Sequence, residues 1–436
     1  MGLFIGMGTG RRGVVGELSD YYYGIEWDVN SAEPACVRIG RQEYHATLPL
    51  HVKMRRCVQR DDRTVAYYLH PMDSTRKEDE SPAKLDGTDG QVMVEIPRHW
   101  RRFETEAEKR RAMFALKRLP GFTEIPTQYI SAYEASLHRP SGKLSSVVNA
   151  NADYRGGNNS ATNDTNSASL LGRPVSQINL TGLRAAARAR DENWNCNTYD
   201  AQTTLHWLMA VEYANMNCQL AYNPQLTTEG WKQGGLGAGV TDLNSTKWSA
   251  FNGSMPFVPC GYTNSLGNAT GVKPYEMPAE YDEVPFTTYV PSYRGIENPF
   301  GHIWKITDGC KCRIMSDAEG GLSEFYVCTD PANYQDTDYT GYKYRGLLPR
   351  ANTYVKELMF GQHGDMMPTK GGASATTYWS DYFNTSIPDT GESQRAVFFG
   401  GSSFYGASAG VRSAYTIYSA AIAYAYRGSR LCNNGV

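Results

Sequence analysis

The chain has 436 residues, of which 41% are hydrophobic and 20% are charged, and its formal net charge is −2. This near-neutral balance argues against a protein that mainly binds nucleic acid, because phosphate binding needs a basic surface. The sequence holds no apolar run of about 18 residues, which argues against a membrane span. Its length allows two or three domains, each with its own core.

The first part of the chain has the pattern of an arm followed by a β-rich domain. Residues 1–20 are rich in glycine and lack a hydrophobic period, and Met1–Arg12 lacks the ordered regions of a secretory signal. We therefore expect an N-terminal attachment arm over 1–20. Alternating and β-prone residues then predict a smaller β-rich domain over 21–120, with strands at 21–27, 36–39, 65–69 and 91–96.

Two polar segments interrupt this β-rich part. Residues 73–89 are polar and charged, which predicts an exposed loop. Arg101–Arg118 is dense in Arg and Lys, but Glu104, Glu106 and Glu108 offset those charges. The second segment is therefore typical of a solvated surface with salt bridges.

Beyond residue 120 the pattern changes to α+β. A strand is predicted over Tyr129–Ala135, and helices over Leu180–Arg190 and Tyr199–Asn217. After Asn217 the chain consists of short strand patterns and turns. Few helices followed by many short strands predict an α+β domain over 121–436.

Catalytic and metal-binding patterns are weak. The nine cysteines are scattered without a C-x-x-C pair, which favours free thiols. The eight histidines lack metal-ligand spacing, and no catalytic set can be assembled, so we expect no enzyme activity and no cofactor. One Asn/Asp-rich loop could offer oxygen ligands to a structural calcium ion, but it lacks an EF-hand pattern, and turn formation explains its composition more simply. Its candidate ligands are Asp153, Asn158, Asn159, Asp164 and Asn166.

The most distinctive segment lies near the C-terminus. Tyrosine dominates the aromatic residues of the chain, with 30 Tyr against 14 Phe and 8 Trp. Ser403–Tyr426 alone holds five Tyr, four Ser and seven Ala, and Arg412 is its only charged residue. Tyrosine among small residues is typical of binding surfaces, because its ring gives a large contact area with few torsions to freeze. In Ala423–Tyr426 a period of two predicts a strand with both tyrosines on one face.

Several motifs resemble the group of C-type-lectin folds that includes the formylglycine-generating, sulfatase-modifying proteins. Tyr129–Glu134 is similar to the opening strand of that group, Gly172–Val175 to its next helix entry, and Thr204–Ala214 to its second helix. Asn298–Thr307 resembles the Asn-x-Phe-Gly-Asn-Val-Trp-Glu-Trp motif, and Phe399–Ser402 and Gly428–Leu431 resemble the closing pair of motifs. The resemblance implies a C-type-lectin-like domain over 121–436.

The group has an enzyme branch and a binding branch. The enzymes use cysteines between the last two motifs, where Ser403–Arg427 holds none and Cys432 lies beyond it. The binding branch contains variable proteins diversified by retroelements, among them phage tropism determinants, whose randomised Asn codons yield Tyr, Ser, Ile, Phe, Thr and Asp. In a variable region at about 400–432, the positions that fit this set are Phe404, Tyr405, Ser408, Ser413, Tyr415, Ile417, Tyr418, Ile422, Tyr424 and Tyr426.

The whole chain is similar to tail receptor-binding proteins of gut Bacteroidales phages, and Gln91–Pro97 resembles a segment of phage tail fibres. The resemblance implies a virion protein of the distal tail, made in the bacterial cytoplasm, that binds a host surface protein or glycan through outward-facing tyrosines. It also implies a trimer that contacts other tail proteins through its N-terminal region. A formylglycine-generating-like oxidase and a bacterial surface-displayed binding protein stay open as alternatives.

Overall fold

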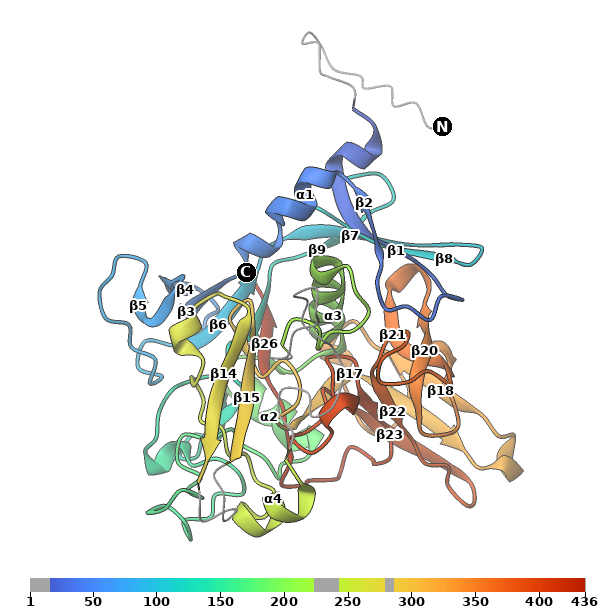
Figure 1. Cartoon of the computed structure of the whole chain (residues 1–436). Helices are drawn as coiled ribbons and strands as arrows, with labels where there is room; N and C mark the ends of the chain where they lie inside the picture. The colour runs from blue at the N-terminus through green and yellow to red at the C-terminus, as the bar shows by residue number, and fades with distance from the viewer. Residues whose placement is uncertain (1–15, 223–242, 279–285, 436) are drawn as a thin grey trace.

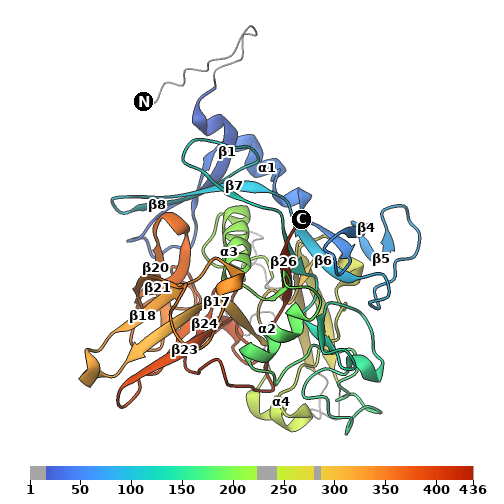
Figure 2. The same ribbon diagram turned by 180° about the vertical axis from the view of Figure 1, so that it is seen from behind.

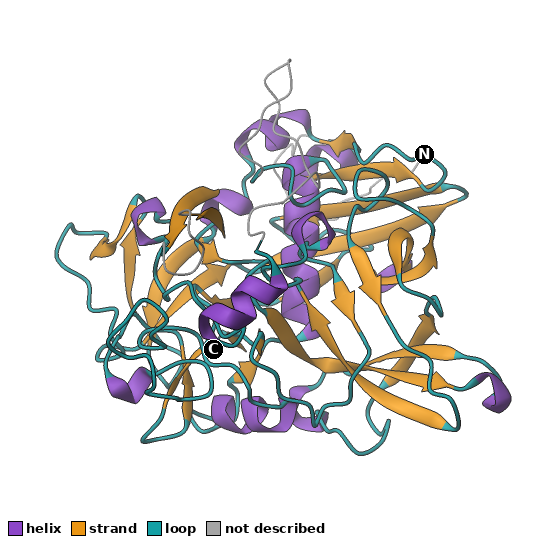
Figure 3. Ribbon diagram, turned by 60° about the horizontal axis from the view of Figure 1, so that its bottom comes forward, coloured by secondary structure: helices purple, strands orange, loops and turns teal. Residues whose placement is uncertain are grey.

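The computed structural model describes residues 16–222, 243–278 and 286–435 (Figure 1). Most of the arm expected over 1–20 therefore lies outside the described residues. The described part is a mixed α+β structure in which strands and irregular loops dominate (Figure 3). This confirms the α+β class. No helix among these residues is long and apolar enough to cross a membrane.

Residues near the N-terminus build an antiparallel five-stranded sheet. Its strands, in spatial order, are β2 (Val37–Gly40), β1 (Tyr22–Asp28), β8 (Lys109–Ala115), β7 (His99–Glu106) and β9 (Thr123–Ile125). The short helix α1 (Gln42–Thr47) follows β2. On β7 and β8 the predicted salt-bridged surface is present: Arg111 pairs with Glu26 at 2.6 Å and with Glu106 at 2.7 Å.

A seven-stranded sheet joins the two halves of the chain. Its spatial order is β13 (Asn195–Cys196), β26 (Leu431–Asn434), β10 (Gln128–Ser131), β6 (Gln91–Ile96), β3 (Arg55–Gln59), β4 (Val65–His70) and β5 (Asp73–Lys77). The boundary expected between the two domains lies at 120/121. β10 and β6 pair directly across it, and one hydrophobic core continues from Tyr23 to Cys432. The first residues of the predicted loop 73–89 form β5 instead, which pairs with β4.

The largest sheet has nine strands and carries the C-terminal segment. Its members are β19 (Lys343–Leu347), β18 (Ser323–Val327), β17 (Trp304–Met315), β23 (Glu392–Phe399), β24 (Ala414–Tyr415), β22 (Tyr382–Asn384), β20 (Thr353–Phe360) and β21 (Asp365–Gly371), with β25 (Arg427–Gly428) beside β17. Smaller elements complete the fold: β11 (Ser136–His138), β12 (Lys143–Ser145), β14 (Gly271–Met277), β15 (Phe286–Tyr293), β16 (Ile296–Glu297) and α4 (Ser245–Asn252).

Two helices cover opposite faces of this nine-stranded sheet. The amphipathic helix α2 (Leu180–Arg188) packs with Ala396 and Phe398 of β23. The alternate residues Val397 and Phe399 belong to the core that contains α3 (Tyr199–Tyr213). Successive side chains of a strand point to opposite faces, so the two helices lie on either side of the sheet.

Helix α3 lies at the centre of the molecule, below the N-terminal strands and beside β17 (Figures 1 and 2). It begins at the cap Thr198, whose hydroxyl accepts a hydrogen bond from the Ala201 amide. Nearly all of its side chains are buried, as expected for a helix enclosed on every side. Both predicted helices are therefore confirmed, and they end a few residues earlier than expected, at Arg188 and Tyr213.

Candidate ligand-binding surface

The C-terminal segment 400–427 has little regular structure of its own. Val411 belongs to the core that contains α3, whereas Tyr415 and Tyr418 pack on the α2 side of the nine-stranded sheet. Hydrogen bonds to surrounding elements nevertheless fix its backbone. The Tyr418 carbonyl accepts from the Ala396 amide at 3.0 Å, the Ala420 carbonyl from Leu180 at 3.1 Å and the Tyr426 carbonyl from Trp304 at 3.0 Å. The segment is thus an irregular loop whose course is set by its neighbours.

Close packing also explains small residues in this segment. A Cβ atom at Gly410 would lie 1.7 Å from the Asp381 Oδ1. Asp381 in turn forms a buried ion pair with Arg412 at 2.9 Å. Arg412, the only charged side chain within Ser403–Tyr426, therefore serves the interior and is not part of the surface.

Six of the candidate residues form one continuous group of rings, called here the aromatic cluster. Its members are Phe404, Tyr405, Tyr415, Tyr418, Tyr424 and Tyr426. Tyr415 stacks on Tyr418 with 5.7 Å between ring centroids, and Tyr424 stacks on Tyr426 at the same distance. All six rings are half-buried. The expectation that they face outward therefore holds only for part of each ring.

Arg427 lies at the centre of the aromatic cluster. Its guanidinium carbon is 4.4 Å from the Tyr424 ring centroid, 4.6 Å from that of Tyr418 and 5.0 Å from that of Tyr415. The side chain is fully buried. Among the described residues it has no carboxylate partner and no well-formed hydrogen bond, so the ring faces are its main stabilising contacts.

The phenols of Tyr405, Tyr415, Tyr424 and Tyr426 remain protonated at neutral pH. Burial raises the pKa of Tyr405 to about 12, and it also raises the pKa of Tyr415 and Tyr426. Hydrogen bonding with Tyr418 raises the pKa of Tyr424. Each of these four tyrosines can therefore offer both a flat apolar face and a hydroxyl that donates and accepts.

The remaining candidates divide into two groups. Ser408, Ile417 and Ile422 are half-buried in the same segment, and the Ser408 hydroxyl lies 2.9 Å from that of Tyr354. The prediction that Ser413 belongs to the binding surface is corrected, because its side chain is fully buried. Its hydroxyl donates to the Ser408 carbonyl at 2.5 Å and so holds the loop together instead of meeting a ligand.

The strand predicted over Ala423–Tyr426 is also absent, since regular pairing begins only at β25. Tyr424 and Tyr426 still share one face, as their rings are stacked with an interplanar angle of 10°. The alternating pattern therefore predicted the orientation of the side chains correctly, but the backbone achieves it in a turn. Loop hydrogen bonds replace the ladder of a strand.

Several residues of this region were not predicted from the sequence as part of the site. Trp304 supports Tyr405 and Tyr415, with ring centroids 5.0 and 5.3 Å away. Tyr354 and Tyr382, from β20 and β22, form a second aromatic pair reached through Ser408. These residues are distant in sequence, so no local pattern links them. Arg427 directly follows Tyr426, and only its position as the first charge after the tyrosines could have drawn attention to it.

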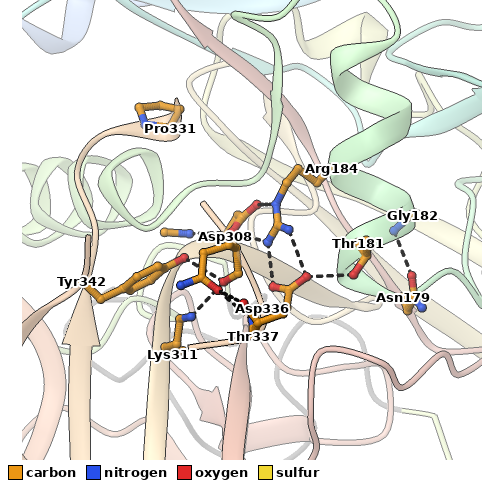
Figure 4. Close-up of polar contacts among 12 residues, drawn as sticks. Asn179, Thr181, Gly182, Arg184, Asp308, Lys311, Pro331, Asp336, Thr337 and Tyr342 are labelled. Carbon is orange, nitrogen blue, oxygen red and sulfur yellow. Dashed lines mark hydrogen bonds and ion pairs between the residues drawn. The ribbon is translucent and has the colours of Figure 1, made fainter. Parts of the chain in front are cut away.

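Helix α2 supports the segment from below through an ion-pair network (Figure 4). Arg184 bonds Asp308 at 2.6 and 3.0 Å and Asp336 at 2.7 and 2.9 Å. Thr181 donates to the same Asp336 at 2.8 Å. Because the Leu180 amide at the start of α2 bonds Ala420, this network also fixes the loop beneath the aromatic cluster.

The residues considered for metal binding or catalysis form hydrogen bonds and ion pairs within the protein. In the Asn/Asp-rich loop, Arg155 bonds Asp164 at 2.7 Å and Asn159 at 3.2 Å. Among the described residues no group of three or more His, Cys, Asp or Glu side chains could hold a metal ion. His302 is buried and bonds Glu134 at 2.5 Å.

The cysteines are all unpaired thiols, and all except Cys36 are buried. Burial raises the pKa of Cys432 to about 12, which keeps that thiol protonated and unreactive. Its Sγ lies 3.0 Å from the Cys196 carbonyl, to which it donates.

The chain matches no protein-family model, and no curated protein matches its sequence.

Proposed function

We propose that the protein is a phage-tail receptor-binding protein that recognises a host surface protein or glycan without covalent chemistry. Its binding face would be the aromatic cluster with Ser408, Ile417 and Ile422, carried on a C-type-lectin-like scaffold of the retroelement-diversified type. Oligomerisation, expected to be trimeric, would raise the modest affinity of one site through avidity.

One observation carries this proposal. The variable-type residues combine a fixed backbone with half-exposed, laterally packed rings around Arg427. A pre-organised loop loses little conformational entropy on binding, and rigid tyrosines supply contact area and hydroxyl groups together. Substitutions at these ring positions would change the ligand without changing the path of the loop.

Adsorption to bacteria tests the proposal. The purified, fluorescently labelled protein is incubated with a panel of Bacteroidales isolates, and a strain that binds it is then used with the triple variant Ile417→Ser, Ile422→Ser, Tyr424→Ser. We expect adsorption to fall at least about tenfold, because contact area and ring hydroxyls at the centre of a binding face dominate affinity. Tyr344→Ser is the matched control, since Tyr344 is 52% exposed and belongs to β19, outside the segment.

The melting temperature is measured for the same variants. The triple variant removes the Tyr424 ring but keeps Tyr415, Tyr418 and Tyr426 around Arg427, so its melting temperature should fall only slightly below that of the parent protein. Undiminished adsorption of a folded triple variant would contradict the proposal, as would failure of the parent protein to bind any strain. Replacing Tyr415, Tyr418, Tyr424 and Tyr426 together by Ala is a poorer test, because it would strip the rings from buried Arg427 and destabilise the fold.

The surrounding DNA offers an independent test. Active diversification predicts a near-copy of the last part of the coding sequence that differs only at adenines, beside a reverse-transcriptase gene. Absence of such a copy would leave a static binding protein and remove the retroelement from the proposal.

A further inference from the structure

The Arg427 guanidinium carries a charge that no carboxylate among the described residues neutralises. Five rings surround it, since the Phe398 and Tyr426 centroids lie 4.6 and 5.4 Å from its carbon, as well as three further tyrosine rings. None of its three nitrogen atoms has a well-formed hydrogen bond within the described part of the chain. The ring faces offset part of the cost of burying this charge, but they do not neutralise it.

The carboxylates packed around the C-terminal segment already have cations. These groups are Glu134 with Lys305, Asp381 with Arg412, and Asp308 and Asp336 with Arg184 and Lys311 (Figure 4). Residues 403–426 themselves contain no Asp or Glu. The charge of Arg427 therefore stays unbalanced in its surroundings, and the surface above it is electropositive.

A cation held against one face of an aromatic ring changes what the opposite face attracts. The negative face of the ring is already engaged with Arg427, so a second cation on the outer face is disfavoured and an electron-rich group is favoured. The guanidinium carbon lies 4.4 Å from the Tyr424 ring centroid. A ligand packed on the outer face would therefore lie roughly 8 Å from the charge, which is close enough for a partly buried charge to act.

The phenol groups of the aromatic cluster add hydrogen-bond donors at the same place. Within the described residues, no phenol of the cluster is a buried atom that lacks a partner, so each hydroxyl either reaches solvent or bonds a neighbour. A carboxylate accepts such bonds, and it also carries the charge that Arg427 attracts. Donors and field therefore favour the same ligand group.

Half-buried ring faces among small side chains suit a sugar. Ser419–Ala421 follow Tyr418 in the chain, and Ala425 separates Tyr424 from Tyr426. Side chains this short cannot cover a neighbouring ring. A pyranose packs its carbon-bound hydrogens on such a face and places its polar groups at the rim, where the phenols lie. An acidic sugar therefore fits better than an acidic peptide, whose carboxylates stand on flexible side chains that lose conformational entropy on binding.

We propose that the aromatic cluster binds an acidic polysaccharide of the host surface, one whose sugars carry carboxylates. The phenols would donate to the carboxylates, and the Arg427 charge would favour them through the rings without touching them, so Arg427 stays buried. This inference rests on the proposed function and names the ligand class of the same site.

Competition for adsorption tests the ligand class. Surface polysaccharide is extracted from a strain that adsorbs the labelled full-length protein, and it is used either intact or with its carboxylates converted to neutral amides by carbodiimide and ethanolamine. We expect the intact polysaccharide to compete with the cells and the amidated form to compete at least about tenfold less well. Adsorption should weaken as the salt concentration rises, and protease treatment of the cells should leave it unchanged.

Variants then test the role of charge at the cluster. Ala421 is exposed in the loop between Tyr418 and Tyr424, so Ala421→Glu places a negative charge beside the rings without disturbing the core. We expect it to weaken adsorption at least about fivefold, whereas the matched control Ala421→Gln should adsorb normally. Arg427→Gln removes the buried charge and should reduce the preference for the intact polysaccharide. If Arg427→Gln does not fold, the two Ala421 variants decide the question.

Three results would overturn this inference and leave the proposed function intact. The first is equal competition by the intact and amidated polysaccharides. The second is adsorption that protease abolishes and polysaccharide does not compete for, which would identify a protein ligand. The third is equal adsorption of Ala421→Glu and Ala421→Gln. Failure of the parent protein to adsorb to any strain would instead contradict the proposed function, and the inference would fail with it.

Discussion

Arg427 is the residue on which the aromatic cluster depends. We predict that Arg427→Lys lowers the free energy of unfolding by about 1–2 kcal/mol, because an ammonium group loses the planar stacking that a guanidinium makes with several rings. Urea denaturation measures the effect. The matched control is Arg313→Lys, whose partner Glu392 is 52% exposed, where a loss below about 1 kcal/mol is expected. Equal losses at both positions would show that the rings do not stabilise Arg427.

A buried histidine makes stability depend on pH. His51 Nε2 donates to the Leu208 carbonyl at 2.9 Å, so its Nδ1 accepts from the Tyr23 hydroxyl at 2.9 Å. Burial lowers the pKa of His51 to about 4. The unfolded chain therefore takes up a proton at higher pH than the folded protein does. Stability is complete above about pH 6.5 and is lost as the pH falls towards 4, by about 3 kcal/mol.

Urea midpoints measured between pH 7 and pH 4 check this dependence. His51→Gln should make the urea midpoint depend less steeply on pH. His138→Gln, at a partly exposed position, should leave that dependence unchanged. His99, whose pKa burial lowers to about 3, contributes to the remaining slope. A parent protein whose stability stays level over this range would contradict the prediction.

At the scale of elements, α2 supports the C-terminal segment 400–427. Its Arg184 is held between Asp308 and Asp336, and Asp308 is 2% exposed. We predict that Arg184→Ala lowers the free energy of unfolding by about 3–5 kcal/mol, because it leaves a buried carboxylate without its cation. Thr181→Val removes one hydrogen bond to Asp336 from an exposed residue and should cost about 1 kcal/mol. Chemical denaturation of both variants shows whether the ion pairs or the packing of α2 contribute more to the free energy of unfolding.

At the scale of the whole molecule, both halves of the chain should fold as one unit. β10 pairs with β6 on one side and with β26 on the other, so a fragment 121–436 would expose a sheet edge and part of the common core. We predict that this fragment alone lacks a cooperative thermal transition in circular dichroism, and that co-expression of 1–120 restores it. A fragment that melts cooperatively by itself would establish 121–436 as an independent domain.

Local pattern predicted much of the secondary structure. β6 begins and ends at the predicted residues, and α2 and α3 begin at theirs, because alternation and helical period are properties of neighbouring residues. The pattern failed where long-range contacts decide the backbone. Ala423–Tyr426 is not a strand because the Tyr424 carbonyl bonds the Gln177 amide, and pairing with β17 begins only at the bond between the Tyr426 carbonyl and the Trp304 amide.

The same distinction holds for the candidate site. The clustering of tyrosines among small residues is visible in the chain, and six of those rings do meet. Their arrangement around Arg427, the burial of Ser413, and the support from Trp304 and Arg184 depend on residues far apart in sequence. The seven-stranded sheet is a stronger case, since Gln128 and Asn195 come to lie on either side of β26 only through pairing with the other end of the chain.

The sequence by itself thus determined the residue chemistry of the C-terminal segment and the positions of its flanking elements, because both are local. Tertiary structure decided which of those side chains face solvent, which charge lies beneath them, and that the β-rich N-terminal part shares a core with the rest. Those outcomes follow from strand pairing between distant segments, and the partner of a strand is selected by the packing of the entire fold.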